Sequence, residues 1–183
     1  MQTKTEATIE DLYNAPDDGN YEIVDGRLVK LMSTGDDPNF TAGEIFASLR
    51  EYAREHPEGR ARTDGVAYVV DLPNRKSFSP DASFSYTRSG MRFVNGAPLF
   101  AAEVRSEHDH GSTADREYAR KRMDYFAAGT EVVWDVDPES QTVRSFRREA
   151  PNAPVVFHMD EMANAEPALP GWRISVDNLF NYN

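Results

Sequence analysis

The 183-residue sequence contains no cysteine and no long hydrophobic run. The lack of cysteine excludes disulfides, thiolate zinc sites and cysteine nucleophiles. No apolar run approaches the ~18 residues of a membrane helix, so we expect no membrane partner. The first residues also lack the charged-then-apolar pattern of a secretory signal, which makes a cytoplasmic location the default expectation.

Basic residues are scarce as well. The chain has 20 Lys and Arg residues against 31 Asp and Glu residues, for a formal net charge of −11. Proteins that bind nucleic acid tightly usually present a basic face, so this balance argues against a general DNA binder. It does not exclude a nuclease, because a site for a divalent metal concentrates carboxylates. Basic residues are locally enriched within residues 116–122 and again at Arg144, Arg147 and Arg148.

Several catalytic motifs are missing. The sequence has no Gly-flanked serine elbow, no Gly-Lys-Ser/Thr phosphate loop and no dinucleotide fingerprint. Ordinary serine-hydrolase and kinase functions therefore lack support. The segment Glu107–His110 contains two histidines and two acids, which are ligands that transition metals accept. A short polar loop has no fixed geometry, however, and we interpret this segment as a mobile loop over the substrate.

The chain has the length of one domain, which we expect to span residues 1–183. Asp25-Gly26 between two β-prone runs is typical of a hairpin turn. Helical spacing of apolar residues and a Gly129 stop signal define the longer helices. Strands are predicted at 21–24, 27–32, 65–72, 80–86, 99–104, 131–136, 142–147 and 155–159, and helices at 8–13, 42–55, 115–128 and 176–180.

Two of the predicted strands each carry a carboxylate among apolar neighbours. These residues are Asp81 and Glu103, and they converge if the two strands pair. A carboxylate in apolar surroundings is costly unless it is paired or binds a metal. Together the two acids could supply the hard oxygen ligands that Mg²⁺ prefers. The alternative interpretation is that both acids lie at strand ends, solvated or bonded to the backbone.

Lys121 lies at the edge of the apolar arc of the helix 115–128. From this position a long side chain can cover the core surface and bring its ammonium group to a site at the rim. A cation near the transition-state charge is the further requirement of phosphodiester hydrolysis. A lone lysine here would usually be solvated, so its significance depends on the two acids. Trp134 and Tyr125 could stack on bases, but an apolar strand and a helix face favour core positions for them.

Six stretches, in this order, closely resemble the Uma2 family of the PD-(D/E)XK restriction-endonuclease-like superfamily. They are Tyr21-Glu22-Ile23-Val24-Asp25-Gly26-Arg27-Leu28-Val29, Pro80-Asp81-Ala82-Ser83-Phe84, Glu103-Val104-Arg105-Ser106, Lys121 with Tyr125 and Gly129, Val133-Trp134-Asp135-Val136-Asp137-Pro138, and Leu169-Pro170-Gly171-Trp172. The resemblance implies a mixed α/β (α+β) fold in which helices flank a central mixed β-sheet. It also implies a Mg²⁺-dependent nuclease site, with Mn²⁺ as a substitute, and DNA as the substrate.

The resemblance assigns roles to five residues. Asp81 and Glu103 match the metal-binding acids, and Lys121 matches a lysine that has moved from the strand to the following helix. Glu22 matches an N-terminal glutamate that completes or orients the metal site. Arg105 stands where the superfamily usually has its lysine and is a secondary candidate, since arginine can stabilise charge but cannot act as a base.

The sequence departs from the family pattern at two places. Thr41-Ala42-Gly43 occupies the neighbourhood in which many relatives have a histidine, and Arg122 replaces the leucine that usually follows the helix lysine. These differences concern substrate handling more than the metal site.

Two functional hypotheses follow. The first is a Mg²⁺-dependent DNA endonuclease with Glu22, Asp81, Glu103 and Lys121 as its catalytic residues. The second is a nucleic-acid-binding or protein-binding module that has kept the fold without cleavage. We also expect a homodimer or higher homo-oligomer, because residues 142–147 alternate as an edge strand would and could pair with a second chain.

Overall fold

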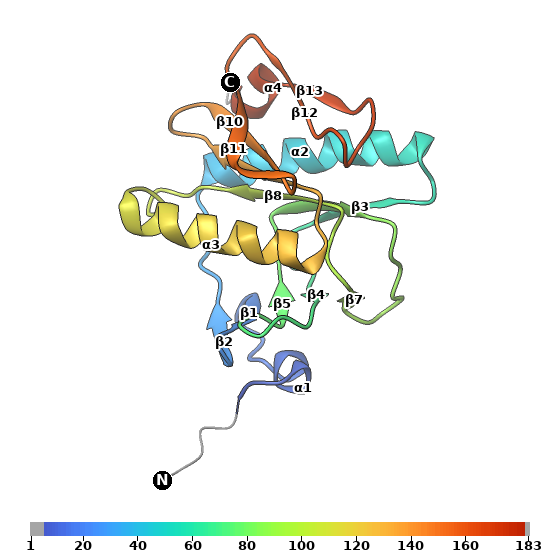
Figure 1. Cartoon of the computed structure of the whole chain (residues 1–183), viewed down its shortest axis with the longest axis vertical. Coiled ribbons are helices and arrows are strands. Elements are labelled where there is room, and N and C mark those ends of the chain that lie inside the picture. The colour runs from blue at the N-terminus through green and yellow to red at the C-terminus, as the bar shows by residue number, and fades with distance from the viewer. Residues whose placement is uncertain (1–5, 182–183) are drawn as a thin grey trace.

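The central feature of the structure, a computed structural model that describes residues 6–181, is a six-stranded mixed sheet (Figure 1). The strand order is β11-β10-β9-β8-β6-β3. β8 and β9 are parallel, and every other neighbouring pair is antiparallel. The strands are β3 (Arg60–Thr63), β6 (Ala82–Ser85), β8 (Phe100–Val104), β9 (Val132–Asp137), β10 (Thr142–Arg147) and β11 (Ala150–Phe157).

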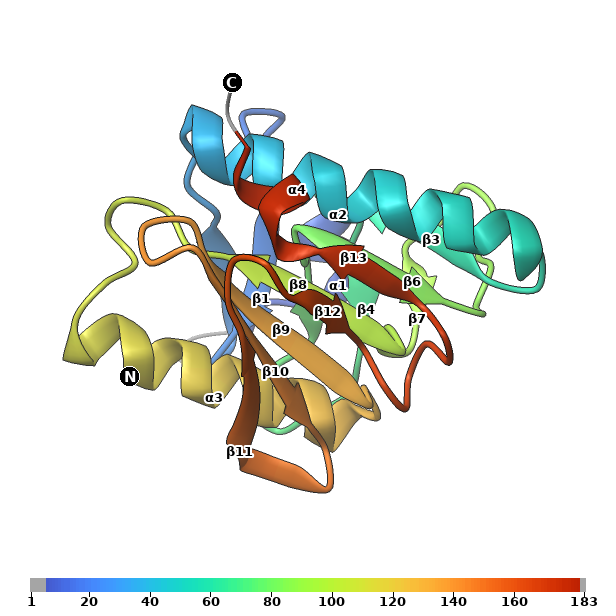
Figure 2. The ribbon, with the colours of Figure 1, turned by 90° about the horizontal axis from the view of Figure 1, so that it is seen from above.

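Helices cover both faces of this sheet, as Figure 2 shows. α2 (Asp36–Glu55) and α4 (Val176–Phe180) lie on one face, and α3 (Ser112–Ala128) lies on the other, where it connects the parallel strands β8 and β9. The predicted mixed α/β fold with a central mixed sheet flanked by helices is thus confirmed. None of the helices within residues 6–181 is long and apolar enough to cross a membrane.

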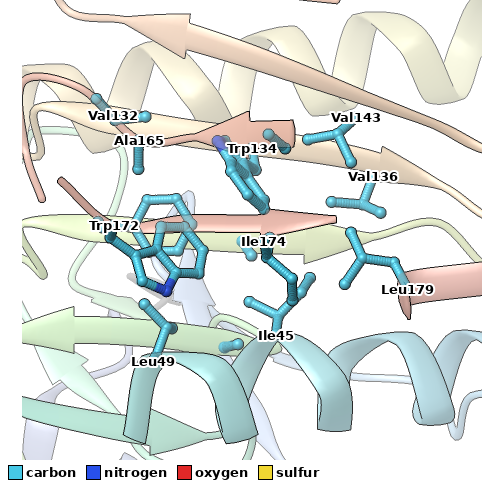
Figure 3. Close-up of a cluster of buried hydrophobic side chains, with 14 of the residues drawn as sticks. Ile45, Leu49, Val132, Trp134, Val136, Val143, Ala165, Trp172, Ile174 and Leu179 are labelled. Atoms are coloured by element: carbon cyan, nitrogen blue, oxygen red, sulfur yellow. The ribbon is translucent and has the colours of Figure 1, made fainter. Parts of the chain in front are cut away.

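The core is divided between the two faces because side chains alternate along each strand. On the α2 face, Trp134 of β9 packs with Trp172 and with Ile45 and Leu49 of α2 (Figure 3). The short strands β12 (Met162–Asn164) and β13 (Arg173–Ser175) contribute to this cluster. On the α3 face, Val133 packs in a second cluster that includes the buried Tyr125. The predicted core positions of Trp134 and Tyr125 are confirmed.

The N-terminal segment forms a smaller layer beside α3 (Figure 1). The predicted hairpin consists of β1 (Tyr21–Val24) and β2 (Arg27–Lys30), and Asp25 and Gly26 at its turn both have positive φ. This pair of left-handed residues is what a tight hairpin turn requires. The remaining elements are α1 (Ile9–Tyr13), β4 (Tyr68–Val69), β5 (Ser77–Phe78) and β7 (Val94–Asn95).

Ile23 of the hairpin forms two hydrogen bonds, one with Ser77 of β5 and one with the preceding residue, Lys76. The Ile23 amide donates to Ser77 Oγ at 2.8 Å, and the Lys76 amide donates to the Ile23 carbonyl at 3.0 Å. This anchorage fixes the neighbouring Glu22 beneath α3.

Some predicted boundaries were wrong. α2 begins at Asp36, six residues before the predicted start. Pro38 does not prevent this earlier start, because it lies in the first turn, where a helix tolerates proline. Only Tyr68 and Val69 of the predicted strand 65–72 are in a strand. The short strands β3, β5, β7, β12 and β13 were not predicted at all.

The prediction that residues 142–147 form an edge strand was also wrong. β10 pairs with β9 on one side and with β11 on the other, so β11 is the edge. Pro151 and Pro154 lie in β11, and proline on an edge strand disfavours pairing with another chain. Dimerisation stays a prediction, but the strand suggested for it is inside the sheet.

Candidate active site

Glu103 lies on β8, and Asp81 immediately precedes β6, the antiparallel neighbour of β8. Ala82 pairs with Ala102, the Asp81 amide donates to the Ala102 carbonyl at 3.1 Å, and Asp81 Oδ2 accepts from the Val104 amide at 2.7 Å. Asp81 is therefore fixed by the two residues that flank Glu103. The pairing on which the predicted convergence depended is present.

Lys121 of α3 reaches both predicted glutamates. Its Nζ lies 2.8 Å from Glu103 Oε2 and 3.0 Å from Glu22 Oε1, and all three side chains are largely buried. The structure thus brings Glu22, Glu103 and Lys121 into direct contact, and Asp81 lies close enough for the charges of Glu103 and Lys121 to shift its pKa. The four residues come from separate parts of the sequence.

Both oxygens of Glu22 are occupied. Oε1 accepts from the Ser79 amide at 2.8 Å as well as from Lys121, and Oε2 accepts from Arg75 Nη1 at 2.5 Å. Burial opposes ionisation of Glu22, but the positive charges of Lys121 and Arg75 outweigh it and lower the pKa of Glu22. With these partners, Glu22 is suited to orient Lys121 rather than to act as a free metal ligand.

Sequence reasoning missed three residues of this cluster. Arg75 is buried and bridges Glu22 to Asp124, whose Oδ2 lies 2.9 Å from Arg75 Nε. Lys121, Asp124 and Tyr125 are spaced i, i+3 and i+4 on α3 and therefore share one helix face. That spacing could have predicted Asp124 and Tyr125, whereas Arg75 carries no signal because it lies in a polar turn far away in sequence.

Tyr125 combines a core position with a polar contact. Its ring stacks on Phe78 with centroids 4.0 Å apart, and its hydroxyl donates to Glu103 Oε1 at 2.6 Å. Each oxygen of Glu103 therefore has its own donor, Tyr125 on one side and Lys121 on the other. These two contacts fix the orientation of the Glu103 carboxylate.

The cluster carries more negative than positive charge. Four carboxylates, Glu22, Asp81, Glu103 and Asp124, face two cations, Lys121 and Arg75, so the cluster has a formal excess of two negative charges when all four carboxylates are ionised. Burial and the nearby charge of Glu103 raise the pKa of Asp81 to about 7. Burial is also the main cause of the raised pKa of Glu103, and Glu22 adds to it.

Lys121 remains protonated in this environment. Burial lowers its pKa, but the carboxylates of Glu103 and Glu22 more than compensate, and the pKa of Lys121 is raised overall. An ammonium group that does not release its proton cannot act as a general base. Lys121 can stabilise negative charge and position a neighbouring group.

One divalent cation would balance the two excess charges. Among residues 6–181, no group of three or more His, Asp or Glu side chains is arranged to hold a metal by itself. Mg²⁺ commonly uses one or two carboxylates and completes its shell with water and substrate oxygens. Asp81 fits this requirement, because it lines a groove of about 240 Å³ with Thr63, Asp64 and Val104. Its Oδ1 has no hydrogen-bond partner in the described chain. Each oxygen of Glu103 accepts only one hydrogen bond from the described residues and keeps a second lone pair, whereas Oε1 of Glu22 already accepts two. The donor set of Asp81 and Glu103 therefore suits Mg²⁺ or Mn²⁺.

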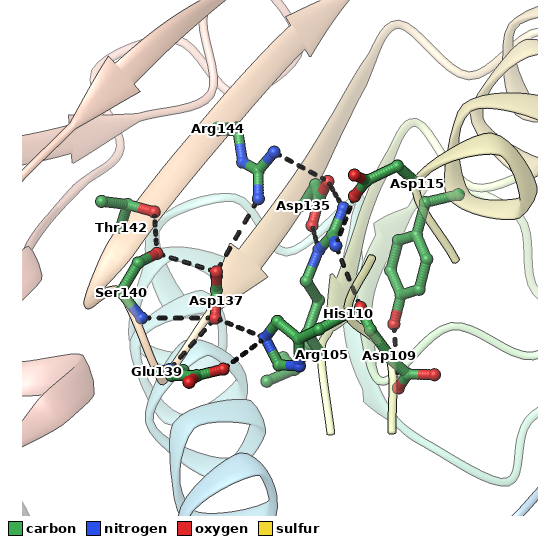
Figure 4. A network of polar contacts seen from close by, with 12 residues as sticks. Arg105, Asp109, His110, Asp115, Asp135, Asp137, Glu139, Ser140, Thr142 and Arg144 are labelled. Carbon is green, nitrogen blue, oxygen red and sulfur yellow. Dashed lines mark hydrogen bonds and ion pairs between the residues drawn. The ribbon is translucent and has the colours of Figure 1, made fainter. Parts of the chain in front are cut away.

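The structure does not bring Arg105, the secondary candidate, into this cluster. Its Nε and Nη2 donate to the two oxygens of Asp135 at 2.7 and 2.8 Å, and its Nη1 donates to Asp115 at 2.7 Å (Figure 4). Nη1 also donates to the Asp109 carbonyl at 3.0 Å. A buried guanidinium with these partners is suited to hold β8, β9 and the start of α3 together.

Hydrogen bonds fix the segment Glu107–His110 against the sheet. Asp109 Oδ2 accepts from the Ser106 amide at 2.9 Å, and His110 Nε2 lies 3.2 Å from both Asp137 and Glu139 (Figure 4). The Asp137 carboxylate is the main reason that the pKa of His110 is raised. Asp137 also accepts from the Glu139 amide at 3.0 Å, so its carboxylate stabilises the turn between β9 and β10.

The mixed sheet flanked by helices therefore carries Glu103 on β8, Asp81 immediately before β6 and Lys121 on α3. Residues 7–177 match the family "Uma2: Putative restriction endonuclease", and the chain belongs to this family. The fold is similar to the crystal structure of a "putative nuclease belonging to DUF820" from Anabaena variabilis ATCC 29413, with a TM-score of 0.75 and 18% sequence identity. That match covers 96% of this chain and 98% of the other. No protein with a curated description matches the sequence.

Proposed function

We propose that this protein is an endonuclease that uses Mg²⁺, or Mn²⁺ in its place, to hydrolyse phosphodiester bonds in DNA. The observation that carries the proposal is the convergence of Asp81, Glu103 and Lys121 in a cluster with a formal excess of two negative charges. A bound divalent cation would neutralise this formal excess and would favour the ionised forms of Asp81 and Glu103.

The protein groups have distinct roles in this proposal. Asp81 and Glu103 hold the metal, whose chemistry when bound is to polarise the phosphate and to lower the pKa of a water molecule. Lys121, held as an ammonium group by its two glutamates, stabilises charge that develops on the phosphate and orients the attacking water. Glu22 positions Lys121, and Arg75 in turn positions Glu22.

The test is cleavage of supercoiled plasmid and of single-stranded DNA with Mg²⁺, with Mn²⁺ and with EDTA. We expect metal-dependent cleavage by the wild type and its loss in Asp81→Asn, which keeps the size of the side chain and an oxygen for the Val104 amide. Glu117→Gln, which changes an exposed acid on α3, should cleave like the wild type. Equal cleavage by the wild type and Asp81→Asn would refute the proposal. Metal-independent DNA binding without cleavage would favour the binding module.

A further inference from the structure

Arg122 Nε is the one fully buried side-chain nitrogen or oxygen atom without a hydrogen-bond partner in the described part of the chain. The residue is 9% exposed, and its Nε is buried with no hydrogen-bond partner. Its guanidinium makes no hydrogen bond or ion pair with any residue among 6–181. Buried charges in proteins are normally paired, so a guanidinium in this state indicates a missing anion.

The surroundings of Arg122 hold it in one place. Its guanidinium carbon lies 3.6 Å from the ring centroid of Phe146 on β10, which fixes the group by a cation–π contact. Only Nε is fully enclosed, so the two terminal amino groups still reach solvent. The guanidinium group is thus fixed by its contact with Phe146, and its two terminal amino groups can still donate hydrogen bonds to a ligand.

A second cation near Arg122 is Arg144, which lies on the same strand as Phe146. Arg144 precedes Phe146 by two residues on β10, so both point to the α3 face and are about 7 Å apart along the strand. The nearest carboxylate oxygens to Arg144 belong to Asp135 and Asp137, at 4.0 and 3.8 Å (Figure 4). These distances are too long for hydrogen bonds.

Those two carboxylates are already used by other groups. Both oxygens of Asp135 accept from Arg105 at 2.7 and 2.8 Å, and Asp137 accepts from Ser140 Oγ at 2.8 Å. Arg122 therefore has no counter-ion among the described residues, and Arg144 has only two long ion pairs and donates no hydrogen bond to them. Burial lowers the pKa of Arg122, and although Asp135 opposes this effect, the charges of Arg144 and Arg105 add to it.

We propose that Arg122 and Arg144 form an anion site between α3 and β10 that binds a phosphate group. Two arginines can direct several N–H donors at one phosphate, and the planar guanidinium matches the oxygens of this ligand. The phosphate could belong to a nucleic-acid backbone or to a free phosphate ion, which the two arms of the test distinguish. The site is separate from the Asp81 cluster, because Lys121 and Arg122 point in different directions from α3.

The test measures binding by calorimetry in EDTA, so that it does not depend on cleavage or on a bound metal. One arm uses inorganic phosphate and the other uses a single-stranded oligonucleotide without a terminal phosphate. The variants are Arg122→Met, which keeps apolar contact with Phe146, and Arg144→Gln. Arg116→Met on the exposed side of α3 is the matched control.

We expect phosphate to bind the wild type and the control alike. Loss of a charged donor should weaken binding on the order of tenfold to a hundredfold in Arg122→Met and Arg144→Gln. A parallel loss in the oligonucleotide arm assigns the site to backbone phosphate, and a loss confined to inorganic phosphate assigns it to a free phosphate group. The proposal is overturned if the wild type does not bind phosphate, or if both variants bind it as the wild type does. If Arg122→Met does not fold, Arg144→Gln decides.

Discussion

Replacement of Asp81 by asparagine should stabilise the metal-free protein at alkaline pH. In the folded protein the pKa of Asp81 is raised from 3.8 to about 7, because the carboxyl is buried and faces Glu103. A rise of about three pH units, at about 1.36 kcal/mol for each, corresponds to roughly 4 kcal/mol of destabilisation once Asp81 is ionised in both states. Asparagine removes the charge and keeps an acceptor for the Val104 amide.

The sign of the pH dependence follows from the direction of the shift. A carboxylic acid whose pKa is higher in the folded than in the unfolded protein stabilises the fold at pH values below its unfolded-state pKa. This stabilisation is lost as the pH rises through the folded-state pKa. In EDTA, wild type should therefore lose stability between about pH 4 and pH 7 relative to Asp81→Asn. At pH 8 the variant should be more stable by several kcal/mol.

The assay is urea unfolding of both proteins in EDTA at pH 5 and pH 8, with Glu117→Gln as the control for loss of one exposed charge. Added Mn²⁺ should stabilise the wild type at pH 8 and have little effect on Asp81→Asn. If Asp81→Asn is no more stable than the wild type at pH 8 in EDTA, the ionised Asp81 carboxylate does not destabilise the folded protein, and the reasoning is refuted.

Three further predictions use the same unfolding measurement. Lys121→Met leaves two buried glutamates without their shared cation and should destabilise the protein by about 3–5 kcal/mol at pH 8. The loss of stability should be smaller at pH 5, where Glu103 protonates more readily. A loss that does not change with pH would contradict this prediction. Tyr125→Phe removes only the hydroxyl that donates to Glu103 and should cost about 2 kcal/mol, whereas no cost would show that this hydrogen bond contributes nothing. His110→Gln removes a contact with Asp137 whose stabilisation is present below the ordinary histidine pKa of 6.5 and is lost as the pH rises through the raised folded-state pKa. The gap between His110→Gln and wild type should therefore be wider at pH 5.5 than at pH 8.5, and a gap that widens with pH would refute this assignment.

Much of the candidate site could be predicted from local sequence signals. The Asp-Gly turn specified the hairpin that carries Glu22, and the apolar runs around Asp81 and Glu103 indicated buried strands that had only to pair. The position of Lys121 at the edge of an apolar helix face indicated that it could reach the same region. These signals are local, and each depends on a few neighbouring residues.

The rest depended on contacts between distant segments. Arg75 contacts Glu22 and Asp124, which are 53 and 49 residues away in sequence, and no local pattern predicts such a bridge. The mistaken edge strand has a related cause. β10 alternates polar and apolar residues, but Arg144 faces Asp135 and Asp137 beneath the loop before α3 rather than open solvent. The alternation of polar and apolar residues along β10 is therefore explained by polar contacts within the protein, although the same alternation is typical of an exposed strand.

The most direct test of the central claim is a calorimetric titration with Mn²⁺ of the wild type, Asp81→Asn, Glu103→Gln and Glu117→Gln, without nucleic acid. If Asp81 and Glu103 hold a divalent cation, the wild type and Glu117→Gln should each bind one Mn²⁺ ion with the same affinity, and the other two variants should lose it. Absence of binding to the wild type, or equal binding by Asp81→Asn and wild type, would contradict the assignment of this cluster as a metal-dependent nuclease site.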